Sequence, residues 1–77
     1  MNRQRRMILK ETLIKIEAIQ NLIQDVYDEE QESIDNMPEN LQSSDRYVNG
    51  EENCDQLMEC YEMLDEISEI INDIIIK

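Results

Sequence analysis

The chain has 77 residues, a formal net charge of −12 and no His, Trp or Phe. A chain this short forms at most one domain with a small core, and its acidity argues against direct nucleic-acid binding, which usually needs a basic surface. The single Gly and single Pro exclude a turn-rich β fold. The Glu, Gln, Ile, Leu and Met content favours long helices.

The chain shows no sign of a membrane segment or a signal peptide. No apolar run approaches the ~20 residues that a membrane span needs. The basic start "MNRQRRMILK" is similar to the start of a signal peptide, but the charged and periodic "ETLIKIEAIQ" follows it. We therefore expect no membrane association and a cytoplasmic location.

Residues 2–36 are predicted to form the first helix. Apolar side chains recur at steps of three or four, with one gap at Glu30, which is the period of a helix with one buried stripe. The predicted stripe consists of Leu9, Leu13, Ile16, Ile19, Ile23, Val26, Tyr27, Ile34 and Met37. Ile8, Ile14 and Leu22 lie beside the stripe and widen it.

Residues 37–43 are predicted to form a corner. Pro38 has no backbone donor and disfavours helical geometry at Met37, so the first helix should end near Asn36. Ser43 or Ser44 can accept hydrogen bonds from the free N–H groups that open the next helix. Asp45 would then lie in its first turn, where a negative charge suits the helix dipole.

Residues 44–76 are predicted to form the second helix. Its stripe consists of Tyr47, Gly50, Cys54, Leu57, Tyr61, Leu64, Ile67, Ile71 and Ile74. Asn49 and Gly50 leave two alternatives: a second short turn, with the helix starting near Glu51, or one continuous helix. We favour the continuous helix with Gly50 on its inner face, where the missing side chain lets the first helix come close.

Two helices of nearly equal length with a short connection favour an all-α fold, an antiparallel two-helix hairpin. Two helices bury only one stripe each, and this chain has apolar residues left over. We therefore expect homo-oligomerisation into a four-helix bundle or a larger helical assembly. The residues assigned to that interface are Tyr47, Leu57, Leu64, Ile67, Ile71 and Ile74.

Charge is distributed unevenly along the chain. Residues 1–24 carry a net charge of +3 and residues 25–77 a net charge of −15. An antiparallel hairpin would bring the basic start alongside the acidic end of the second helix, so cross-helix ion pairs are expected there, each of small value. The corner end has only Arg46 as a cation.

The acidity of the corner has two interpretations. Charge runs usually form a solvated surface that keeps a protein soluble. Alternatively, the corner steers onto a basic surface of another protein and mimics phosphate there. The residues assigned to partner binding are Glu29, Glu30, Asp35, Glu39, Asp45, Glu51 and Glu52.

No catalytic residue, cofactor or metal is expected. Cys54 and Cys60 are six residues apart, too far for a disulfide within one helix, and two thiols without His do not make a zinc site. No calcium-loop spacing is present. The carboxylates of "EMLD" and "EE" loosely resemble an Mg²⁺ site, but in so acidic a chain this spacing arises readily by chance. Because the chain has no His, neither Ser43 nor Ser44 can be activated as a nucleophile in the Ser-His manner.

The segment "VYDEEQESIDNMPENLQSSDRY", followed by "CYEMLDEISEIINDI", resembles small helical-hairpin proteins encoded by bacteria and their phages. The shared features are D-E-E-Q-E, then D-N-x-P-E-x-L-Q, then a Ser at the start of a second acidic and aliphatic helix. The resemblance covers residues 26–74 and departs from the family pattern at "VNG". It implies a hairpin fold and a mobile-element setting, and it supplies no catalytic residues.

Three functions follow as hypotheses. The first is a non-enzymatic, phage-type inhibitor whose acidic corner occupies a basic site on a host defence or nucleic-acid enzyme. The second is a structural module that assembles helices. The third is a small-ligand sponge that holds nucleotide phosphates between subunits. The basic residues assigned to that third role are Arg3, Arg5, Arg6 and Arg46.

Overall fold

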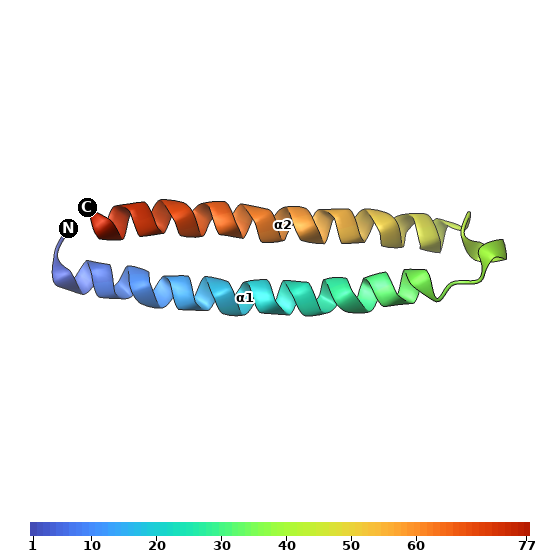
Figure 1. Ribbon diagram of the computed structural model, residues 1–77, viewed down its shortest axis with the longest axis horizontal. Coiled ribbons are helices and arrows are strands. Elements are labelled where there is room, and N and C mark those ends of the chain that lie inside the picture. The colour runs from blue at the N-terminus through green and yellow to red at the C-terminus, as the bar shows by residue number, and fades with distance from the viewer.

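The computed structural model describes residues 1–77 as an all-α hairpin. Helix α1 spans Arg3–Asp35, a short 3-10 helix η1 spans Glu39–Leu41, and helix α2 spans Asp45–Ile76. The long helices lie side by side and antiparallel, with both termini at one end and the corner at the other (Figure 1). The molecule measures 60 × 15 × 13 Å. The predicted hairpin is confirmed, and each helix begins and ends within one residue of the prediction.

Local chemistry sets the ends of α1. Asn2 is its N-cap, and its side-chain oxygen accepts a hydrogen bond from the backbone N–H of Arg5 at 2.8 Å. At the other end, Asn36 still donates to the Glu32 carbonyl, and Met37 donates to that of Ile34. Pro38 then takes extended geometry, with φ −58° and ψ 147°, so α1 ends where the proline rule predicts.

The corner holds one element that the sequence reasoning missed, the single turn η1. Backbone hydrogen bonds run from Leu41 to the Pro38 carbonyl and from Gln42 to the Glu39 carbonyl. Ser44 then caps α2, since its Oγ accepts from the backbone N–H of Tyr47 at 3.3 Å and donates to the Leu41 carbonyl at 2.6 Å. One serine therefore ties η1 to the start of α2.

Burial along both helices follows a seven-residue repeat. We label its inner positions a and d, as in a coiled coil. In α1 and the residues after it, position a holds Arg6, Leu13, Gln20, Tyr27 and Ile34, and position d holds Leu9, Ile16, Ile23, Glu30 and Met37. In α2, position a holds Tyr47, Cys54, Tyr61, Ser68 and Ile75, and position d holds Gly50, Leu57, Leu64 and Ile71. Every one of these residues is buried or half-buried.

This repeat corrects the predicted stripes. Ile19, Val26 and Ile67 were assigned to the buried stripes, but all three are exposed. Gln20 and Ser68 occupy the inner positions beside Ile19 and Ile67, and Glu30 fills the place that looked like a gap. Ile19 and Gln20 both fit steps of three and four, as do Ile67 and Ser68, and the prediction placed the more apolar residue of each pair inside.

Gly50 lies inside a continuous α2, so the favoured alternative is confirmed. Gly50 is buried, and a Cβ added there would lie 2.9 Å from Cγ1 of Ile34 and 3.2 Å from Oε1 of Glu30. The absence of a side chain thus lets α1 approach at this level, where Ile34 is only 3% exposed.

Along the hairpin as a whole, few inner side chains are fully buried. The buried apolar residues are Ile16, Ile34 and Cys54, and no large side chain is completely buried. Arg6 Nε is buried without a hydrogen-bond partner, so this inner-position arginine gains no ion pair through Nε. Neither helix combines the length and apolar content needed to cross a membrane.

Candidate functional site

The corner carries most of the residues assigned to partner binding. Asp35 is the last residue of α1, Glu39 opens η1, and Asp45 is the first residue of α2. Glu29 and Glu30 lie in the last two turns of α1, and Glu51 and Glu52 in the second turn of α2. The antiparallel arrangement therefore gathers these seven side chains, here called the corner carboxylates, at one end of a 60 Å molecule (Figure 1).

Six of the seven corner carboxylates are exposed. Between Lys15 and Lys77 the only cation is Arg46, which lines an open surface pocket with Pro38, Leu41 and Ser44. Two nearby acids have local amide partners, since Gln24 donates to Asp28 at 2.9 Å and Gln31 donates to Asp35 at 3.0 Å. The end of the hairpin is thus a solvent-facing negative surface with a single positive charge.

Glu30 is the exception among the seven. It is half-buried at a d position, and its carboxylate faces Gly50. Cys54 lies one turn further along α2 and is buried. Burial raises the pKa of the Cys54 thiol above its ordinary value, with smaller contributions from the charges of Glu30, Asp55 and Asp35. Glu30 is therefore half-buried against α2, unlike the other six corner carboxylates.

The corner presents negative charge on its exposed surface. No group of three or more His, Cys, Asp or Glu side chains is placed to hold a metal ion. Cys54 and Cys60 are both free thiols, the first buried and the second exposed. An exposed negative surface of this kind can attract and occupy a cationic surface.

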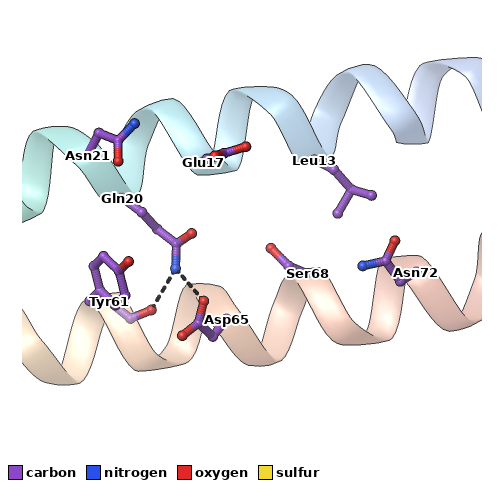
Figure 2. A pocket seen from close by; sticks show the side chains of 8 residues that line it. All are labelled: Leu13, Glu17, Gln20, Asn21, Tyr61, Asp65, Ser68 and Asn72. Carbon is purple, nitrogen blue, oxygen red and sulfur yellow. Dashed lines mark hydrogen bonds between the residues drawn. The ribbon is translucent and has the colours of Figure 1, made fainter.

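A second feature, which the sequence reasoning missed, is a polar groove halfway along the hairpin. Its centre is Gln20, whose Nε2 donates to the Tyr61 carbonyl at 3.1 Å and to Asp65 Oδ1 at 2.8 Å (Figure 2). The groove has a volume of about 340 Å³. Its lining residues are Leu13, Glu17, Gln20, Asn21, Tyr61, Asp65, Ser68 and Asn72.

Gln20 joins the two helices and fixes their alignment. Its two hydrogen bonds are the only side-chain hydrogen bonds that run between α1 and α2, and Gln20 is only 7% exposed. A polar side chain at an inner position specifies register, because a shifted pairing would leave it buried and unpaired. The sequence contains a signal for this inner position, because Gln20 lies seven residues from Leu13 and seven from Tyr27, both in the predicted stripe.

The residues assigned to an oligomer interface have mixed positions. Tyr47, Leu57, Leu64 and Ile71 occupy a and d positions and are half-buried within the hairpin itself. Ile74 is half-buried beside them, and Ile67 is exposed. The first four residues thus already pack within one molecule, and the apolar surface free for another chain lies elsewhere on the helices.

No protein-family model matches the chain, and no curated protein or solved structure matches it either. The resemblance to small phage and bacterial hairpin proteins at the corner stays a prediction.

Proposed function

We propose that this protein is a non-enzymatic protein binder whose acidic corner occupies a basic site on another protein. The observation that carries the proposal is the convergence of exposed carboxylates from α1, η1 and α2 on one end, with Arg46 as the only cation there. Closely placed carboxylates on a rigid support present negative charge much as a phosphate backbone does.

The partner class follows from this charge. A basic groove that normally holds nucleic acid is complementary to the corner in charge. Together with the phage-type resemblance, this favours an inhibitor of a host defence or nucleic-acid enzyme that acts in the bacterial cytoplasm. Glu39 lies in η1, within the corner that connects the two long helices, and would make the deepest contacts.

The test compares two charge-reversed variants that carry the same net charge. The corner variant is Asp35→Lys, Glu39→Lys and Asp45→Lys, and every changed residue is exposed. The control variant changes three exposed carboxylates near the other end of α2. They are Glu66, Glu69 and Asp73, each replaced by Lys. Each triple change raises the net charge by six, so a difference between the variants reports the position of the charge.

Immobilised wild-type protein is used to capture partners from a nuclease-treated bacterial lysate, and the captured protein is then purified and titrated against all three forms. We expect the control variant to bind as wild type does and the corner variant to lose affinity by about thirtyfold or more. Duplex DNA and raised ionic strength should both displace the hairpin. Equal binding of the two variants, or binding that DNA does not affect, would contradict the proposal.

A further inference from the structure

The hairpin leaves more surface exposed than a compact monomer of its size. A folded monomer of 9.2 kDa exposes about 4,900 Å² on average, whereas this molecule exposes 6096 Å². The difference, about 1,200 Å², arises because two helices bury only one side of each other. An unusually large surface is therefore free for a further contact.

The exposed apolar side chains are concentrated on one side of the hairpin. Seven of those on the helices occupy positions c and g, on the d side of the seven-residue repeat, and are 45–65% exposed, whereas Met7, Ile14, Val48 and Ile76 occupy b positions. We call this set the apolar side face. It consists of Ile8, Ile19, Leu22 and Val26 of α1, and Met63, Ile67 and Ile70 of α2.

Two grooves show which positions of α1 and α2 share a side of the hairpin. Val26 of α1 and Cys60 of α2, both at g positions, line one groove together. The polar groove lies on the other side of the hairpin, where Glu17, Asp65 and Asn72 occupy e positions. The g positions of α1 and α2 therefore share one side, and the e positions share the opposite, polar side.

We infer that a second copy of this chain covers the apolar side face, giving an antiparallel dimer that is a four-helix bundle. A half-exposed Ile or Leu offers on the order of 80 Å² of apolar surface. The seven side chains then bury about 1,100 Å² over two copies before their polar neighbours are counted, close to the range of about 1,200–2,000 Å² for specific interfaces.

The charge distribution favours a second copy as the partner on the apolar side face, and it favours an antiparallel orientation of that copy. The apolar residues of α1 run from Ile8 to Val26, so the middle of the face lies near residue 17. A two-fold axis there, perpendicular to the long axis, brings Arg5 of one copy, at a g position, alongside Glu29 of the other, at a c position. A parallel pair would instead place the two acidic corners together, where like charges repel.

The same geometry leaves the end of each acidic corner uncovered. Because the axis lies near residue 17, Asp35, Glu39 and Asp45 extend past the first residue of the other copy. The dimer would present two acidic ends pointing in opposite directions. The dimer rests on the apolar side face and on Glu29, whereas the test of the proposed function changes Asp35, Glu39 and Asp45, so either proposal can fail without the other.

Two variants of α1 test the face. Leu22 on the apolar side face is 65% exposed, and Ile14 at a b position away from it is 68% exposed. Leu22→Glu and Ile14→Glu add the same charge to the same helix, and neither side chain belongs to the inner surface of the hairpin. Sedimentation equilibrium at micromolar concentration should give a dimer for wild type and for Ile14→Glu. Leu22→Glu should raise the dimer dissociation constant at least about a hundredfold while circular dichroism still shows a helical protein.

A monomeric wild type at these concentrations, an assembly larger than a dimer, or equal effects of the two variants would overturn the inference.

The relative direction of the two copies is tested by a spin label at Gln4→Cys in a chain that also carries Cys54→Ala and Cys60→Ser. In the antiparallel dimer the two labels are about 40 Å apart, since Gln4 lies opposite Glu30. Labels less than about 20 Å apart would show a parallel pair and contradict the charge argument.

Discussion

At the scale of single residues, Gly50 shows packing overriding helix propensity. Glycine inside a helix costs about 1 kcal/mol relative to alanine. Here it lies at an inner position where a Cβ would meet Cγ1 of Ile34 at 2.9 Å. The close approach of α1 makes the smallest residue the one that fits.

Gly50→Ala should therefore lower the free energy of unfolding by about 1 kcal/mol, because the overpacking cost of about 1–3 kcal/mol exceeds the gain in propensity. Urea unfolding at a fixed protein concentration measures this. In an Ile34→Ala background the clash is absent, and Gly50→Ala should become stabilising. A stabilised Gly50→Ala in the otherwise wild-type chain would contradict the close approach.

Cys54 makes stability depend on pH. Burial, followed by the charges of Glu30, Asp55 and Asp35, raises the pKa of its thiol above the ordinary value of 9.0. The folded protein holds the thiol proton more tightly than the unfolded chain does. The resulting stabilisation is complete below that ordinary pKa and is lost as the pH rises through the higher, folded value.

We expect the free energy of unfolding of the wild type to fall as the pH rises above the ordinary thiol pKa of 9.0, more steeply than that of Cys54→Ala. The two proteins are compared by urea unfolding below and above that pH, and their difference isolates the thiol from other titrating groups. Parallel curves would show that Cys54 does not contribute.

At the scale of the elements, the sequence predicted the hairpin well because its signals are local. Pro38, the Ser44 cap and the lengths of the apolar stretches determine where α1 ends and α2 begins. The one-turn η1 was missed, since the polar run between Pro38 and Ser44 carries no hydrophobic period.

The inner surface was harder to predict than the helices. An α helix repeats every 3.6 residues, and two packed helices select a strict repeat of seven by winding around each other. That repeat placed Gln20 inside and Ile19 outside, against their hydrophobicity. The reason is visible only across the pair, because Gln20 finds its hydrogen-bond acceptors on α2. Of the seven corner carboxylates, six are exposed and Glu30 is half-buried, while their assignment to partner binding stays a prediction.

The two serines before α2 provide a matched test of capping. Ser44→Ala removes both the bond to the Tyr47 N–H and the bond to the Leu41 carbonyl, and should cost about 1 kcal/mol of unfolding free energy. Ser43 is exposed, and Ser43→Ala should change the value by less than about 0.5 kcal/mol. Thermal melts of both variants measure the difference, and equal melting temperatures would contradict the cap assignment.

At the scale of the whole molecule, folding back at Pro38 creates features that neither helix has alone. It gathers the corner carboxylates at one end and leaves the net positive first 24 residues at the other. It also aligns the g positions of α1 and α2 into one apolar side face. The acidic end and the apolar side face, on which the two proposals rest, are thus both consequences of one antiparallel pairing.

The most direct test of that pairing is the distance between labels on the two helices of one chain. Spin labels at Gln4→Cys and Asp73→Cys, in a Cys54→Ala and Cys60→Ser chain, are measured by double electron–electron resonance with an excess of unlabelled protein. Both positions are exposed and lie near the end where the termini meet. The hairpin predicts a distance below about 30 Å, because packed helix axes lie 8–10 Å apart. A distance near 100 Å, as in an opened or continuous helix, would contradict the fold and with it both proposals.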